Sequence, residues 1–430
     1  MSEKYIRIEL TPLAPYFLGG ERGLKYDDND TQMSRGEKYY IRSNLMPNQS
    51  ALFGVLRFLG IENPDSSYSL KKEDENRIGK ESYRLDKPSK VGFGMIKKIS
   101  PLYLMRKEDE NEPPAENDKE NKKNKKEGDN LYFPAPMLIA AMDSGNSKKN
   151  NQYECLETDC GSRWLPLFYS EKDAELFRFI HLSDGALLDK EINPFRYQTR
   201  VVINRKRDYN NGISTYPEKD KDFLKKDYVI LDGFRFVFYA KVGEGLFDFS
   251  QEKIIKKSVF IGQGKCPFAA EISDAEDFGE KMIRIDATVF SQEVGKRLGN
   301  PVTVSGEKKD CCYAFLVSDM FYEGSMDELK ERCVYAMTAQ KQYRVFTTNY
   351  AAQEAVSGKK GNGRFVKQNE VLHLLQAGST FVFESREQMN GFKKQIDGMK
   401  LFTHGQIAGF NGIFYYDPND NAKSDTEDSK

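Results

Sequence analysis

Residues 227–242 read DYVILDGFRFVFYAKV, and this stretch decides the class of fold. Aliphatic and aromatic residues dominate both of its halves, which is typical of β-strands. Between the halves stands Asp232-Gly233, a dipeptide that favours the tight turn of a β-hairpin. The stretch therefore predicts two strands joined by a hairpin turn.

Strand-like and helical segments mix on both sides of this stretch. A helix is expected from about Gln49 to Leu59, because apolar residues recur there at helical spacing and Asn48 offers a cap oxygen. Regular βαβ spacing is missing, which favours α+β domains with mainly antiparallel sheets over one doubly wound sheet. Further strand-like runs are 5–18, 90–105, 257–272, 282–290, 311–320 and 378–385, and further helical patterns lie near 327–334 and 387–396.

The composition is that of a soluble protein with more than one domain. A chain of 430 residues is long enough for two domains with separate cores. Its mean hydropathy of -0.68 and its 30% charged residues indicate a large wet surface. The start MSEKYIRIEL is charged from its third residue, so neither a signal peptide nor a membrane span is expected. The six cysteines are scattered and form no CxxC pair, so a cytoplasmic location is expected.

Charge is distributed unevenly along the chain although the net charge is only -1. Residues 417–430 carry five acids and two lysines and are expected to form a disordered acidic tail. Residues 106–128 carry seven basic and eight acidic side chains and no large apolar side chain. Because such a segment has nothing to bury, it is expected to be a disordered insertion.

No catalytic or metal-binding constellation is recognisable. The three histidines, His181, His373 and His404, are far apart, and no HxH, HExxH or CxxC spacing occurs. His404 lies in the glycine-rich run LFTHGQIAGFNG, where a loop histidine could serve an RNA-cleaving enzyme as general acid or base. We therefore expect no enzyme activity, no metal and no cofactor.

Two glycine-rich motifs leave a weak case for phosphate contact. The first is Gly262-Gln263-Gly264-Lys265, and the second is GKKGNGR at 358–364. Neither fits the P-loop GxxxxGK[ST] or the GxGxxG fingerprint. Backbone N–H groups beside a cation suit an anion, but a plain turn explains each motif equally well.

The strongest local charge lies in RYQTRVVINRKR at 196–207. Five cations occur there without an acid, Tyr197 is interleaved, and an Asn-Asn-Gly turn follows. We interpret the region from about 196 to 228 as a long basic β-hairpin. Cations bind phosphates and an aromatic ring can stack on a base, so RNA is the expected ligand, with a solvated hairpin as the alternative. The five cations are Arg196, Arg200, Arg205, Lys206 and Arg207.

Eight segments, taken in order, form a recognisable set: IELTPLAPYFLGG, YYIRSNLMPNQSALFGVLRFLGI, GFGMIKKISPLYL, YFPAPM, the basic hairpin leading to DGFRFVFYAKV, VFIGQGKCPF, LLQAGSTFVFES and GQIAGFNGI. This ordered set resembles the RAMP proteins of CRISPR-Cas systems, and among them the subunit that holds the 5′ handle of the guide RNA (crRNA) in type III complexes. The pattern is nearer to type III-B.

The resemblance implies two ferredoxin-like, RRM-related domains with antiparallel sheets, a thumb-like basic β-hairpin and Gly-rich loops. The domains are expected at 1–245 and 246–416, followed by the tail. The implied partners are crRNA, target RNA indirectly, the large polymerase- and cyclase-like subunit and backbone RAMP subunits. The implied RNA-binding residues, besides the five cations of the hairpin, are Arg42, Ser43, Asn44, Asn48, Gln49 and Ser50 at a helix start, and Gly262, Gln263, Gly264, Lys265, His404, Gly405, Gln406, Gly409 and Asn411 in glycine loops.

Two other functions stay open from the sequence. One is a RAMP-type endoribonuclease that processes precursor crRNA, with His404 as its acid–base residue. The other is a protein–protein scaffold without RNA contact, which the nearly neutral net charge favours.

Overall fold

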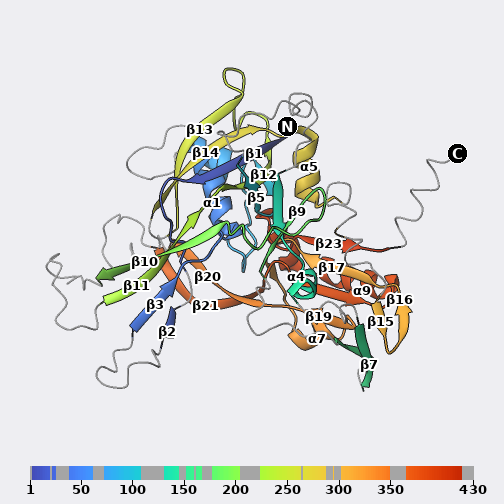
Figure 1. Ribbon diagram of the computed structural model, residues 1–430. Coiled ribbons are helices and arrows are strands. Elements are labelled where there is room, and N and C mark those ends of the chain that lie inside the picture. Colours follow the sequence, from blue (N-terminus) through green and yellow to red (C-terminus); the bar gives the residue numbers. More distant parts are fainter. Residues whose placement is uncertain are drawn as a thin grey trace, which may run out of the picture.

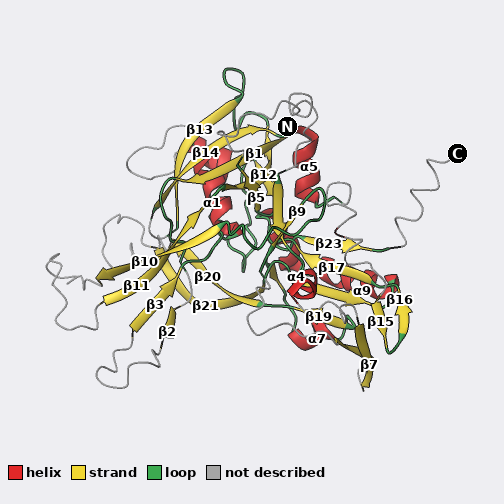
Figure 2. Cartoon of the chain, in the orientation of Figure 1, coloured by secondary structure: helices red, strands yellow, loops and turns green. Residues whose placement is uncertain are grey.

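The structure is a computed structural model that describes residues 2–19, 22–25, 38–61, 72–107, 130–144, 152–158, 161–166, 177–203, 223–262, 265–286, 294, 302–348 and 365–418. Most of the predicted insertion, residues 419–430 of the predicted tail and the tip of the predicted basic hairpin lie outside these ranges. Figure 2 shows that strands dominate the described chain and that the helices are short.

An eight-stranded sheet forms the upper part of the molecule in Figure 1. At its centre β1 (Glu3–Pro12) pairs antiparallel with β12 (Phe234–Gly243), so that Ile8 lies opposite Phe238. The strand order is β13-β14-β1-β12-β5-β6-β9, and β4 also pairs with β12. The other strands of this sheet are β4 (Ile96–Ile99), β5 (Tyr103–Arg106), β6 (Leu131–Pro134), β9 (Phe179–His181), β13 (Ile254–Ile261) and β14 (Cys266–Asp274).

Helices cover both faces of this sheet. Helix α1 (Gln49–Leu59) packs Leu52, Phe53 and Leu56 against the face that carries the buried side chains of Ile6 and Ile8. Each such side chain contributes roughly 1.5–3 kcal/mol to stability when it is fully buried. Helix α5 (Glu276–Arg284) covers the opposite face. Two further helices in the first part of the sequence are α2 (Lys72–Ile78) and α4 (Met137–Ser144).

A separate four-stranded sheet projects from the body, at the left of Figure 1. Its order is β10-β11-β3-β2, and it consists of β2 (Arg22–Lys25), β3 (Lys38–Arg42), β10 (Phe195–Ile203) and β11 (Phe223–Leu231). Strands β10 and β11 pair antiparallel, whereas β11 and β3 pair in parallel.

Three smaller sheets build the remainder of the described chain. Their orders are β16-β15-β7-β8, β19-β22-β17-β23 and β18-β21-β20. The strands are β7 (Gln152–Thr158), β8 (Gly161–Pro166), β15 (Val302–Val304), β16 (Glu307–Lys309), β17 (Cys312–Leu316), β18 (Met320–Phe321), β19 (Tyr335–Met337), β20 (Gln340–Thr348), β21 (Phe365–Leu375), β22 (Thr380–Phe383) and β23 (Ile413–Tyr416), and the helices are α7 (Met326–Lys330), α9 (Arg386–Asp397) and α10 (Lys400–Ile407).

The α+β class with mostly antiparallel sheets is confirmed. Two ferredoxin-like domains stay a prediction, and so does the division at 245/246. The strands that follow this division, β13 and β14, join the sheet of β1, because β14 pairs with β1 from Ile6 to Pro12.

The prediction that the strands on either side of Asp232-Gly233 pair with each other in a hairpin is wrong. Both strands form, but β11 pairs with β10 and β3, whereas β12 pairs with β1, β4 and β5. The local pattern specifies an extended chain, while the partner of each strand depends on distant segments. The expected strand at 282–290 is also wrong at its start, since Met282–Arg284 end helix α5.

Candidate nucleic-acid interface

The paired strands β10 and β11 form a ribbon at the position where the sequence predicts the basic hairpin. Phe195 lies opposite Leu231 at its base, and Ile203 lies opposite Phe223 at the outer end of the described strands. Residues 204–222 lie outside the described residues, and the predicted site residues Arg205, Lys206 and Arg207 belong to them. The described part of the ribbon therefore tests the placement of Arg196 and Arg200 only.

One face of the ribbon holds Arg42 against an aromatic ring. The guanidinium of Arg42, at the end of β3, lies 4.7 Å from the ring centroid of Tyr197. Its Nε is 3.7 Å from Oδ2 of Asp227, which is buried, and Thr199 donates a hydrogen bond of 2.7 Å to the same carboxylate. Tyr197 stays 41% exposed, so its ring is open to a base.

The other face carries two more cation–aromatic pairs. Arg200 lies opposite Lys226 in the register, and its guanidinium is 4.8 Å from the ring centroid of Tyr228. Nζ of Lys226 is 5.1 Å from the centroid of Phe17, and the rings of Phe17 and Tyr228 are 5.5 Å apart. Aromatic rings thus hold two neighbouring cations side by side, which favours an approaching phosphate.

Arg196 is positioned by an acid instead of a ring. Its Nη2 donates to Oδ2 of Asp232 at 2.6 Å, and both side chains are more than half exposed. An ion pair this exposed adds little to stability. Arg196 therefore stays accessible to an anion.

The start of α1 is a second element suited to an anion. Asn48 is the N-cap residue in extended conformation, but its side chain makes no cap hydrogen bond, and the first turn holds no acid. The first N–H groups of a helix have no partner within the helix, and they carry partial positive charge. At the opposite end of the helix, the last turn carries the basic residue Arg57. The α1 start can therefore accept a phosphate.

Ser43 and Asn44 support the loop before α1. Ser43 is buried; its Oγ accepts a hydrogen bond from N of Leu18 at 2.9 Å and donates to the carbonyl oxygen of Asn44. The backbone N–H of Asn44 donates a hydrogen bond to the carbonyl oxygen of Gly19. These bonds give Ser43 a structural role and leave the Asn44 side chain at the surface of a cleft.

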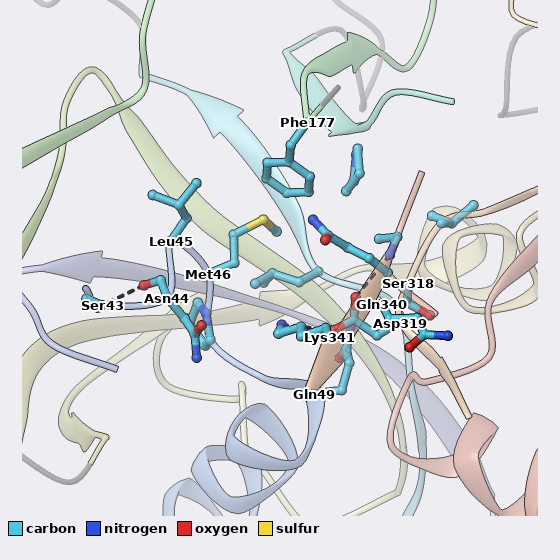
Figure 3. Close-up of a pocket in the computed structure, with 16 residues that line it drawn as sticks. Ser43, Asn44, Leu45, Met46, Gln49, Phe177, Ser318, Asp319, Gln340 and Lys341 are labelled. Atoms are coloured by element: carbon cyan, nitrogen blue, oxygen red, sulfur yellow. Dashed lines mark hydrogen bonds and ion pairs between the residues drawn. The ribbon is translucent and has the colours of Figure 1, made fainter. Parts of the chain in front are cut away.

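The cleft lies between the loop 43–49 and residues from several distant segments of the chain, with a volume of about 390 Å³ (Figure 3). Nζ of Lys341 donates to Oδ2 of Asp319 at 2.9 Å, and Oδ1 of Asp319 accepts from N of Ala377 at 3.0 Å. Sequence reasoning missed this part of the site. No local motif marks it, because its residues come from segments spread over the chain. The lining residues are Ser43, Asn44, Leu45, Met46, Pro47, Gln49, Leu102, Pro134, Phe177, Val317, Ser318, Asp319, Gln340, Lys341, Gln376 and Ala377.

Gly262 and Lys265 of the first glycine motif lie between β13 and β14. N of Lys265 donates to the carbonyl oxygen of Gly262 at 3.1 Å, and Lys265 is exposed. Gly262 has φ +78°, and a Cβ there would lie 2.8 Å from the carbonyl oxygen of Phe17, so only glycine fits. Gln263 and Gly264 lie outside the described residues. The turn therefore lies beside the loop that carries Phe17.

The run around His404 is partly helical, which corrects the expectation of a loop. His404, Gly405 and Gln406 belong to α10, which extends to Ile407. Burial of Phe402 and His404 against the core outweighs the weak helix propensity of glycine. Only Gly409 and Asn411, of the predicted loop residues, lie beyond the helix, and both have positive φ.

His404 is enclosed rather than presented to solvent. Its Nε2 donates to the carbonyl oxygen of Arg84 at 2.6 Å, and its ring stacks on Tyr83 with centroids 4.9 Å apart. Burial lowers the pKa of His404, and the Arg84 hydrogen bond and the Asp86 charge oppose this shift. The neutral ring therefore dominates near neutral pH.

Asn411 joins three segments from within the core. It is fully buried; its Nδ2 donates to the carbonyl oxygen of Phe402 at 2.9 Å, and its Oδ1 accepts from N of Phe321 at 2.8 Å. Its backbone N–H donates to the carbonyl oxygen of Asp319. These bonds give Asn411 a structural role, and RNA contact by its side chain stays a prediction.

Within the described ranges, no group of three or more His, Cys, Asp or Glu side chains is arranged to hold a metal ion. Among the same residues, no helix combines the length and apolar character needed to cross a membrane.

No family model and no curated protein matches the chain. Among solved structures, it resembles a chain of the Type III-B Cmr-beta bound to cognate target RNA, with a TM-score of 0.40, 14% identity, and coverage of 95% of this chain and 96% of that chain. A chain of the same assembly bound to cognate target RNA and AMPPnP gives a TM-score of 0.39 and 12% identity, with the same coverage. TM-scores below 0.5 do not establish a shared fold, so the function rests on the residues of this chain.

Proposed function

We propose that this chain is a non-catalytic, RNA-binding subunit of a type III CRISPR-Cas effector complex. In that complex it holds the 5′ handle of the crRNA and contacts the large polymerase- and cyclase-like subunit and the backbone RAMP subunits. The resemblance of the sequence motifs supports the choice of complex and partners. One observation supports RNA binding: three cation–aromatic pairs lie on both faces of the ribbon β10–β11, formed by Arg42 with Tyr197, Arg200 with Tyr228, and Lys226 with Phe17.

The ribbon has the chemistry of a single-strand platform. Its cations lie 4.7–5.1 Å from ring centroids, within the roughly 6 Å over which cation–π attraction acts. Cations attract phosphates of any sequence, and an exposed ring stacks on any base. Since Arg42 ends β3 only a few residues before α1, a strand bound at the ribbon can continue to the α1 start.

The experiment is to isolate the tagged chain from its native host, sequence the bound RNA and identify the co-purifying proteins. We expect short RNAs with one shared 5′ handle, together with a large polymerase-like subunit and RAMP proteins. The double variant Arg200→Ala/Lys226→Ala should lose most of the RNA. Lys256→Ala on the distant edge strand β13 is the control, because Lys256 is exposed and pairs weakly with Glu271. Unchanged RNA recovery with the double variant would contradict the role of the ribbon.

The two alternative functions predict other results. An endoribonuclease would cut precursor crRNA in the absence of metal, and His404→Ala would abolish the cleavage if His404 were its acid–base residue. The buried position of His404 does not favour this function. A protein–protein scaffold would purify with partner subunits that bind RNA independently of the ribbon.

A further inference from the structure

The cleft beside α1 is lined by four carboxamide side chains. Asn44 and Gln49 come from the loop and first turn of α1, Gln340 begins β20, and Gln376 follows β21. No hydrogen bond to another described residue occupies the amide groups of Asn44, Gln340 or Gln376. Gln49 is only 6% exposed, and its buried Oε1 has no hydrogen-bond partner among the described residues. Figure 3 shows Phe177 at one end of the cleft and Gln49 at the other.

The charge of the cleft excludes a ligand recognised mainly through phosphate. Among the described residues that line it, Lys341 and Asp319 are the charged ones, and they neutralise each other at 2.9 Å. Carboxamides present a donor and an acceptor side by side, which matches the hydrogen-bonding edge of a nucleobase. Phe177, Met46 and Leu102 supply apolar surface for the faces of a ring. The volume of about 390 Å³ lies in the range of small-molecule sites.

The wall of the cleft is held by the Asp319 side chain and by one backbone hydrogen bond. Asp319 binds both Lys341 and N of Ala377, and N of Gln376 donates to the carbonyl oxygen of Ala339 at 2.8 Å. The carboxamides of Gln340 and Gln376 therefore project from a fixed frame, which lowers the entropy cost of binding.

We infer that this cleft takes one unstacked nucleobase of a single-stranded RNA, whose edge is read by the carboxamides of Asn44, Gln340 and Gln376. The inference rests on the RNA-binding function proposed above. The cleft would add base selectivity to the RNA-binding surface, because the ribbon contacts only the phosphates of the RNA and the faces of its bases. The phosphate of the same nucleotide would lie at the α1 start, since Gln49 belongs to both sites.

The test measures binding of the full chain to labelled ten-nucleotide homopolymers rA, rC, rG and rU by fluorescence anisotropy. We expect the wild type to prefer one homopolymer by about fivefold or more, the range of a bidentate base contact. Gln340→Ala and Gln376→Ala should reduce this ratio towards one and change the affinity for the other homopolymers less than about twofold. Gln342→Ala is the matched control, because Gln342 is exposed on the same strand outside the cleft.

A wild type without preference, or variants that keep the wild-type ratio, would overturn the inference while leaving RNA binding intact. If no homopolymer binds, the function proposed above fails, and the cleft is then tested with the four free nucleosides at millimolar concentration. A rise in Tm with one nucleoside in the wild type and Gln342→Ala, but not in Gln340→Ala, would support a base site. No rise with any nucleoside would overturn it.

Discussion

The phenol of Tyr343 on β20 donates a hydrogen bond of 2.7 Å to Oγ of Ser50 in the first turn of α1. The two residues are 293 positions apart in the sequence. The ring of Tyr343 also packs edge-on against Phe410, with centroids 5.7 Å apart. Tyr343 thus joins strand β20 to the α1 start through a hydrogen bond and to the turn after α10 through a ring contact.

Tyr343→Phe is expected to lower the free energy of unfolding by roughly 1 kcal/mol, the net contribution of one hydrogen bond. Burial raises the pKa of Tyr343 to about 12, so its hydroxyl is protonated at neutral pH and donates. Urea unfolding of Tyr343→Phe, Ser50→Ala and the double variant measures the coupling between the two residues. Additive effects of the single changes would mean that the bond does not stabilise the fold.

Tyr197→Ala is expected to weaken binding of single-stranded RNA by roughly 1–3 kcal/mol, because the exposed ring offers a stacking surface. Tyr197→Phe keeps the ring and should bind like the wild type. Anisotropy titrations at several salt concentrations compare the two variants. Because Tyr197 carries no charge, the salt slope should stay nearly unchanged, and a loss of slope would show that the variant displaces Arg42 instead.

His404 is expected to make stability depend on pH. Its pKa in the folded state is lowered by burial, so the unfolded chain binds more protons between that value and roughly 6.5. The contribution is fully present above about pH 6.5 and is lost as the pH falls through the lowered pKa. Unfolding free energies of the wild type and His404→Phe, measured from pH 5 to 8, should converge at low pH. A constant difference would contradict the assignment.

Asn411→Ala is expected to destabilise the fold by roughly 1–3 kcal/mol, because it leaves the buried N–H of Phe321 and the carbonyl of Phe402 without their partner. RNA affinity per folded molecule should stay unchanged. Thermal unfolding and RNA titration of the same preparation separate the two effects. A loss of RNA affinity in a variant with wild-type stability would restore the predicted RNA-binding role of Asn411.

The local fold could be predicted from the sequence where the residue pattern of a single segment is enough to specify a helix or a strand. Helix α1 begins and ends at the residues expected from its apolar spacing, and α9 covers the pattern at 387–396. The strands β10 and β11 lie at the position predicted for the arms of the basic hairpin, because they follow each other in the sequence and pair antiparallel. Arg42 was predicted beside α1, but its stacking on Tyr197 depends on the parallel pairing of β3 with β11.

The sequence by itself determined the α+β class, the helix at 49–59 and the two arms of a basic ribbon, since strand alternation, helical spacing and charge are properties of neighbouring residues. Only the tertiary structure decided which strands pair, that His404 and Asn411 are enclosed, and that four carboxamides from distant segments line one cleft. The physical reason is that pairing and burial depend on which distant surfaces meet, and the hydrophobic effect that brings them together is not directional. A lone Gln at the end of a strand therefore carries no local mark of the cleft that it lines.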